Sequence, residues 1–150
     1  MALRTLRFIG DPILTKKAKP IRIFDDTLET LIDDMIETMR SHEGVGLAAP
    51  QVGSLKRVVV IDVGEGIVEL VNPEIVSADG IQKREEGCLS IPGVRGVVER
   101  PESVKVVAFD RNGNSFELEG REIMAIALSH EIDHLNGLLF VEKQIEESEK

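Results

Sequence analysis

The sequence contains no tryptophan and no tyrosine, and only five phenylalanines among its 150 residues. A chain of this length can bury a sizeable core, and that core has to be aliphatic. Long apolar runs are also missing: the VVVI segment at 58–61 is among the longest, far below the ~20 residues that span a bilayer. The N-terminal segment has no apolar signal core. We therefore expect a cytoplasmic protein without a membrane partner.

Cysteine and positive charge are scarce as well. Cys88 is the only cysteine, so an internal disulfide is excluded, which fits a reducing compartment. Lys and Arg together number 18 against 27 Asp and Glu, which gives a formal net charge of −9 at pH 7. Phosphate backbones and anionic membranes repel a protein of this charge. We expect no direct binding of nucleic acid.

The chain shows no internal repeat and no low-complexity linker, which predicts a single domain over residues 1–150. Its first regular pattern covers residues 25–41, where apolar residues recur at helical spacing and form one apolar face. Asp26 with Glu29 forms a capping arrangement that predicts the start of this helix. The glycines in the segment that follows predict its end.

The middle of the chain changes to the pattern of short β-strands separated by Gly, Pro, Asn and Asp. The predicted strands cover residues 57–63, 67–73, 74–80, 94–100, 103–110 and 115–120. The segment DRNGNS at 110–115 is typical of a hairpin turn, because Asn-Gly accepts positive φ at little cost. Connections this short predict antiparallel pairing.

Helical spacing returns from about Arg121 and stops at Asn136–Gly137. Only a narrow strip of this helix is polar, formed by Glu122, Ser129, Asp133 and Asn136. A helix this apolar is usually buried. We therefore predict an α+β fold in which antiparallel β-sheets surround a buried central helix.

The predicted buried helix contains the segment HEIDH at 130–134. His130 and His134 lie one helical turn apart, with Cβ atoms about 5–6 Å from each other, close enough to bind one metal ion. Two core histidines bonded to backbone carbonyls are the alternative, but the full H-E-x-x-H pattern favours the metal. Glu131 suits a proton carrier beside that metal.

The third protein ligand can be sought by elimination. Metalloproteases with a third histidine after the motif would have it at Phe140, which cannot bind metal. Glu142 or Glu146 would have to fold back from a short chain end, and we expect them to be solvated. Upstream, His42 lies at a predicted helix end, where a surface position is expected. Cys88 offers a thiolate, a far stronger ligand for Zn or Fe than a carboxylate. Elimination favours Cys88, with one coordination position open.

Three motifs together resemble those of peptide deformylases. GVGLAAPQ at 44–51 is similar to their G-x-G-x-A-A-x-Q segment, EGCLS at 86–90 to E-G-C-x-S, and HEIDH at 130–134 with Gly137 to H-E-x-D-H-x-x-G. They occur in the family's order and span most of the chain. One departure is Ser129, where the family usually has glutamine. Because we place this residue on the polar strip, we expect little effect on the chemistry.

The resemblance implies removal of the N-formyl group, as formate, from the initiator N-formylmethionine of newly made polypeptides. A metal-bound water would attack the formyl carbon, with Glu131 as general base and then general acid. Gln51 and the backbone N–H of Leu89 would donate hydrogen bonds to the oxyanion. Val45 and Gly46 would line the substrate cleft, beside an aliphatic pocket for the methionine side chain.

The resemblance also implies one divalent metal ion held by Cys88, His130 and His134. It implies Fe(II) in the cell, although Cys/His/His sites bind Zn readily, and Zn, Ni or Co can occupy the purified protein. The partners are nascent formylmethionyl peptides. Some family members dock on the ribosome through a basic C-terminal helix, but here the C-terminal segment is acidic, with Glu142, Glu146, Glu147 and Glu149 against Lys143 and Lys150. We therefore expect transient ribosome proximity without such a docking tail.

Two other functions compete with this prediction. An H-E-x-x-H endopeptidase would cleave internal peptide bonds and use a third ligand other than Cys88. A non-catalytic domain would use Cys88 and the two histidines as a structural zinc site. Structural sites are usually closed by four protein ligands, and His42 is the residue that would supply the fourth.

Overall fold

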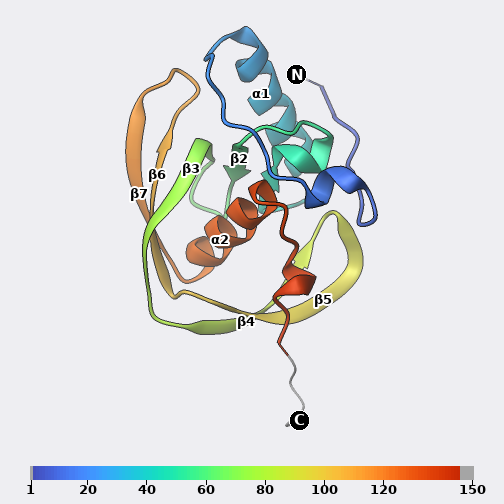
Figure 1. Ribbon diagram of the computed structural model, residues 1–150, viewed down its shortest axis with the longest axis vertical. Coiled ribbons are helices and arrows are strands. Elements are labelled where there is room, and N and C mark those ends of the chain that lie inside the picture. Colours follow the sequence, from blue (N-terminus) through green and yellow to red (C-terminus); the bar gives the residue numbers. More distant parts are fainter. Residues whose placement is uncertain (1, 146–150) are drawn as a thin grey trace.

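The computed structural model describes residues 2–145 (Figure 1). Its helices are α1 Asp26–Ser41 and α2 Ile123–Leu135, with short 3-10 helices η1 Pro12–Thr15, η2 Ala49–Val52 and η3 Phe140–Glu142. Its strands are β1 Gly46–Ala48, β2 Val58–Ile61, β3 Val68–Asp79, β4 Gln82–Cys88, β5 Ile91–Arg100, β6 Ser103–Phe109 and β7 Ser115–Arg121.

The described strands pair antiparallel throughout, as their short connections predict. One sheet has the order β1-β2-β3-β6-β7, and β4 with β5 forms a separate two-stranded sheet. The predicted hairpin connects β6 to β7. There the Asp110 carboxylate accepts hydrogen bonds from the N–H groups of Asn112 and Asn114, and Gly113 has a φ of 86°.

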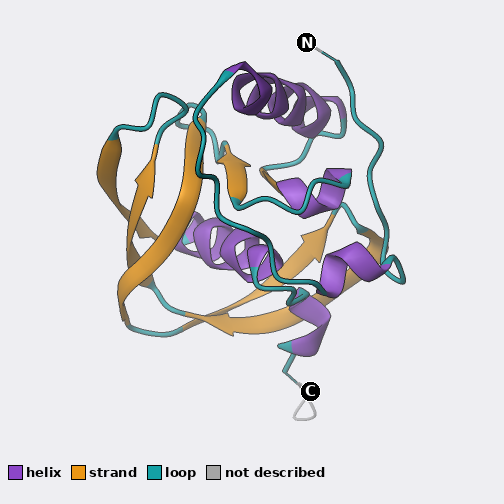
Figure 2. Ribbon diagram, turned by 45° about the horizontal axis from the view of Figure 1, so that its top comes forward, coloured by secondary structure: helices purple, strands orange, loops and turns teal. Residues whose placement is uncertain are grey.

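The five-stranded sheet lies between the two long helices (Figures 1 and 2). Val59 and Ile61 of β2 pack in the aliphatic core with α2, whereas Val58 and Val60 pack in a second core with α1. This alternation is the period of two that a strand buried on both faces produces. Helix α2 also contacts β5, so the β4–β5 hairpin covers the side of α2 that faces away from the large sheet. The predicted fold class is confirmed.

The two strands predicted on either side of Pro73 are one continuous strand, β3. Its register shifts between Val71 and Glu74, where Asn72 has a φ of 51°. The Asn72 carboxamide bonds to both the N–H and the carbonyl of Ile21, which fixes this bulge. At a bulge, Pro73 does not have to donate an interstrand hydrogen bond, so the strand can continue through it.

Strands β1 and β4 were not predicted from the sequence. The β1 residues, Gly46–Ala48, are small and few, and their strand conformation comes from pairing with the distant β2. The β4 sequence, QKREEGC, is polar with a single buried residue, and it is extended because β5 pairs with it. In both strands the partner, and not the local pattern, decides the conformation.

The N-cap of α1 is Asp25, one residue before the predicted capping pair. The Asp25 side chain accepts a hydrogen bond from Leu28 N–H at 3.2 Å, and Asp26 with Glu29 lies inside the first turn. The predicted cap was therefore wrong by one position. Asp25 has the extended backbone that an N-cap needs, with φ −137° and ψ −169°. Asp26 and Glu29 still interact favourably with the helix dipole.

Neither α1 nor α2 could cross a membrane, and the same holds for every helix within residues 2–145, since none is both long and apolar enough.

The cap assignment can be tested by substitution. Asp25→Ala should lower the free energy of unfolding by about 1 kcal/mol, because Leu28 N–H loses its acceptor. Asp26→Ala should cost only about 0.3–0.5 kcal/mol, because it removes a dipole interaction alone. Urea unfolding monitored by circular dichroism measures both. A larger loss for Asp26→Ala than for Asp25→Ala would contradict the assignment.

Candidate metal centre

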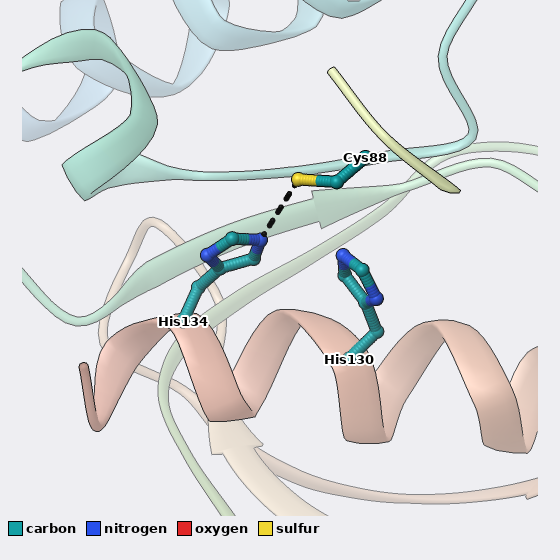
Figure 3. Close-up of side chains that lie close together, drawn as sticks. All are labelled: Cys88, His130 and His134. Atoms are coloured by element: carbon teal, nitrogen blue, oxygen red, sulfur yellow. Dashed lines mark hydrogen bonds between the residues drawn. The ribbon is translucent and has the colours of Figure 1, made fainter. Parts of the chain in front are cut away.

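Helix α2 and the end of β4 bring three metal-binding side chains together (Figure 3). Cys88, His130 and His134 each offer one donor atom, and these atoms lie within 4.8 Å of one another. His134 Nε2 is 3.4 Å from Cys88 Sγ, and the two imidazole rings have centroids 4.9 Å apart. Cys88, which was selected by elimination, and the two histidines of the HEIDH segment form the only such group of His, Cys, Asp and Glu within residues 2–145.

Gln51 of η2 also contacts the Cys88 thiol. Its Nε2 lies 3.5 Å from Cys88 Sγ and 3.1 Å from Ser90 Oγ, while its Oε1 accepts a hydrogen bond from Ala48 N–H. The amide is 1% exposed and held at both ends. Leu89 follows Cys88 in the two-residue turn between β4 and β5, so its backbone also lies beside the thiol.

A buried ion-pair network lies behind His130. Its Nδ1 is 2.9 Å from Glu86 Oε1, and Arg100 donates two hydrogen bonds to the Glu86 carboxylate, at 2.8 and 3.0 Å. Arg100 also pairs with Asp133 at 2.6 Å, and Lys143 Nζ lies 3.1 Å from the same carboxylate. Burial alone would raise the pKa of Glu86, but the hydrogen bonds from His130 and Arg100 lower it to about 2.

Glu86 and Arg100 are site residues that the sequence prediction did not assign. Glu86 belongs to the quoted EGCLS motif, and Arg100 is a cation at the end of a strand whose alternate residues are apolar. Neither feature of the sequence indicates that Glu86 and Arg100 pair with each other. The Glu86 carboxylate accepts a hydrogen bond from His130 Nδ1–H, which leaves Nε2 facing Cys88. A hydrogen bond of this kind usually orients a metal-binding histidine.

The electrostatics of the donor set suit a metal cation. Burial lowers the pKa of His130, but its interactions with Cys88 and Glu86 outweigh this and raise the pKa to about 10. Burial lowers the pKa of His134 well below its usual value, which favours a neutral imidazole. A cluster that attracts a proton between a thiol and an imidazole also attracts a metal ion. The residues therefore fit a Cys/His/His metal site.

Glu131 is buried beside the donor set, with 5% of its surface exposed. Its Oε1 has no hydrogen-bond partner within residues 2–145. Burial raises the pKa of Glu131 to about 7, although the charge on His130 opposes the shift. A carboxyl group with this pKa can accept and return a proton near neutral pH.

The predicted site residues meet at a cleft of about 850 Å³. Its lining includes Cys88, His130, Glu131, Gln51, Leu89, Val45 and Gly46. His134 is fully buried next to Cys88. Ile123, Ile126 and Ala127 of α2 add an apolar wall. The structure thus brings all eight predicted site residues together from three separate segments: three residues come from 45–51, two from 88–89 and three from α2.

The residues excluded as ligands have other positions. Phe140 is buried and stacks on the His130 ring, with centroids 6.0 Å apart. His42 is exposed at the C-cap of α1, and its Nδ1 is 3.0 Å from the Thr38 carbonyl oxygen. Glu142 is exposed, and its carboxylate accepts a hydrogen bond from Leu139 N–H.

The polar strip predicted for α2 is wrong at Ser129. This residue is 5% exposed, and its Oγ has no hydrogen-bond partner within residues 2–145. The strip fails there because the fold covers α2 on more sides than its polarity suggests. Glu122 and Asn136 are exposed, as predicted. The acidic residues at 146, 147 and 149 lie outside the described residues.

The fold and the site define a class: metal-dependent hydrolases with a Cys/His/His ligand set, an open cleft and a buried acid beside it. The sequence matches the model of the polypeptide deformylase family over residues 3–150, and the chain belongs to this family.

Individual relatives agree with this membership. The peptide deformylase of Acetivibrio thermocellus is 58% identical over 97% of this chain and 85% of the relative, and that of Alkaliphilus metalliredigens is 56% identical over 98% and 100%. The crystal structure of the Thermotoga maritima peptide deformylase has a TM-score of 0.95 at 43% identity, covering 97% of this chain and 100% of its own. The Synechococcus elongatus peptide deformylase in complex with actinonin has a TM-score of 0.93 at 44% identity, covering 97% and 81%. The resemblance drawn from the three motifs is confirmed.

The network behind His130 predicts a specific effect on metal affinity. Glu86→Gln keeps the shape of the side chain but removes the charge that orients His130, so it should weaken Co(II) or Zn(II) binding about 10–100-fold. Competition with a chromophoric chelator measures this. Glu85→Gln is the control, because Glu85 is exposed and pairs with Arg95 on the surface. Unchanged affinity in Glu86→Gln would contradict the role of the network.

Proposed function

We propose that the Cys88, His130 and His134 site is the catalytic centre with which this enzyme removes the N-formyl group from N-formylmethionine at the start of newly made polypeptides. One observation carries the assignment: the buried Glu131 side chain, whose Oε1 has no hydrogen-bond partner within residues 2–145, lies beside the candidate metal donors at the cleft. A site that only held a structural metal would have no use for an unpaired acid, since burying it costs stability.

Cys88, His130 and His134 would hold one divalent ion. Such an ion lowers the pKa of water bound to it towards ~7, which makes hydroxide available at neutral pH. A thiolate and two imidazoles suit Fe(II), Zn, Ni and Co. We propose Fe(II) in the cell, with the other three able to replace it in purified protein.

Glu131 would act as the proton carrier. It takes the proton from the attacking water and delivers it to the amine that leaves when the formamide C–N bond breaks. The products are formate and a peptide with a free N-terminal methionine. The pKa of Glu131 near 7, raised by burial, suits both steps, because neither the proton uptake nor its release is strongly unfavourable.

Gln51 and Leu89 would stabilise the tetrahedral intermediate. The Gln51 side chain is fixed with Nε2 toward Cys88, and a sulfur atom at 3.5 Å is a weak acceptor, so a developing oxyanion can compete for this hydrogen. The Leu89 N–H belongs to the same turn as the thiol and would supply a second donor. Removing one such donor commonly costs ~3–4 kcal/mol of transition-state stabilisation.

Val45 and Gly46 would bind the substrate backbone. Gly46 starts β1, which pairs with β2 on one side and is the edge strand of the sheet. A free strand edge is suited to an extended peptide, which adds its own backbone hydrogen bonds. Ile123 and Ile126 offer an apolar surface in the same cleft for the methionine side chain.

The setting of the reaction follows from its substrate. Formylated nascent chains emerge at ribosomes, so we propose that this single domain, residues 1–150, works in the bacterial cytoplasm close to them. The net charge of −9 disfavours direct binding to nucleic acid. We expect transient proximity to the ribosome.

The reaction can be tested by formate release from an N-formyl-Met tripeptide. Protein purified anaerobically and loaded with Fe(II) or Ni(II) should release formate, and Glu131→Ala should lower kcat about 10²–10⁴-fold while still binding one metal ion. Formate is measured with a coupled dehydrogenase. No release from wild-type protein that holds one equivalent of metal would refute the proposed function.

The ligand set can be tested by metal content. Cys88→Ser should lose most of its metal during dialysis, because a hydroxyl is a much weaker donor than a thiolate. His42→Ala should keep one equivalent, since His42 lies outside the donor group. Elemental analysis measures both. Loss of metal from His42→Ala would favour a closed structural site with four protein ligands.

A further inference from the structure

Gly46 lies directly against the carboxyl group of Glu131. A Cβ atom added at Gly46 would be 2.6 Å from Glu131 Oε2, 3.0 Å from Cγ and 3.1 Å from Cδ. Non-bonded carbon and oxygen atoms do not approach to 2.6 Å, so an added methyl group cannot share this space with the carboxyl group in its present place. The φ of Gly46 is not in the left-handed region, so the backbone alone would accept other residues. The glycine is required for space.

The strand is better fixed than the carboxyl group. Gly46 and Leu47 pair with Ile61 and Val60 of β2, and Leu47 and Ala48 are 0% exposed in the core on either face of the sheet. The Glu131 carboxyl group is the end of a flexible side chain, and its Oε1 has no hydrogen bond within residues 2–145. Under steric pressure the carboxyl group would move and the strand would stay.

We propose that Gly46 is a positioning residue for Glu131: its missing side chain sets where the proton-carrying carboxyl group stands relative to the donor cluster. This inference rests on the proposed function, in which Glu131 moves the proton. It is separate from any hydrogen bonds that the Gly46 backbone makes to substrate, because Gly46→Ala retains the backbone groups.

Kinetics distinguish the two roles of Gly46. In Gly46→Ala the carboxyl group is displaced by several tenths of an ångström or more, and misplacement of a reacting group by ~1 Å can cost about 100-fold. We expect kcat to fall about 30–100-fold, with KM changed by less than about threefold. A rise in KM with unchanged kcat would overturn the proposal, because it would assign Gly46 to substrate binding alone.

Gly120→Ala is the matched control. A Cβ atom at Gly120 would lie 2.7 Å from Leu128 Cδ1 and 2.7 Å from Met124 Cγ, so it creates a contact of the same tightness with the same helix, away from the site. We expect Gly120→Ala to lower the Tm without lowering kcat. Equal losses of kcat in Gly120→Ala and Gly46→Ala would overturn the proposal, since general disturbance of α2 would then explain both.

Shortening the acid should relieve the clash. Glu131→Asp withdraws the carboxyl group from Gly46, so Gly46→Ala should cost less than about threefold in a Glu131→Asp background. If Gly46→Ala instead lowers kcat by the same factor in the Glu131→Asp background as in wild type, the two residues do not act through a direct contact.

Crystal structures of wild type and Gly46→Ala test the steric part without any activity. A displaced Glu131 carboxyl group over an unmoved β1 is the expected result, and a shifted β1 with the carboxyl group in place would overturn it. Because this readout does not need turnover, it separates failure of this inference from failure of the proposed reaction.

Discussion

The burial of ionisable groups on helix α2 is the constraint on which the site depends. His130, Glu131 and His134 are 7%, 5% and 1% exposed, inside an otherwise aliphatic core. A buried charge costs several kcal/mol unless a partner compensates for it. His130 pairs with Glu86, Glu86 pairs with Arg100, and Arg100 pairs in turn with Asp133. His130 is therefore held in one orientation by a chain of buried ion pairs.

Glu131 is not held by such a chain. Its Oε1 has no hydrogen-bond partner within residues 2–145, and burial raises its pKa to about 7. The same burial that destabilises the ionised carboxylate makes it a carrier that can take up and release a proton at neutral pH. Its position therefore depends on packing, and Gly46 of β1 leaves no room for a Cβ atom beside the carboxyl group.

The chain after α2 completes the support. Phe140 stacks on His130, Lys143 pairs with Asp133, and Ile145 N–H bonds to the Val97 carbonyl of β5. These contacts join the C-terminal segment to the hairpin that carries Cys88 and to the helix that carries the histidines. Ligands from separate parts of the chain thus share one framework, which is the condition for a metal site of defined geometry.

The sequence by itself determined the helix with its two histidines, the acid beside them, the sole thiol and the α+β class, because helical spacing and ligand chemistry are local properties. It did not predict β1 or β4, the continuity of β3 through Pro73, or the burial of Ser129, because pairing and packing partners decide these features. It also did not predict the partner of Glu86, and it gave Gly46 no role beyond lining the substrate cleft. Only the tertiary structure placed Arg100 beside Glu86 and Glu131 against Gly46. Contacts between distant segments cannot be recognised in either segment alone.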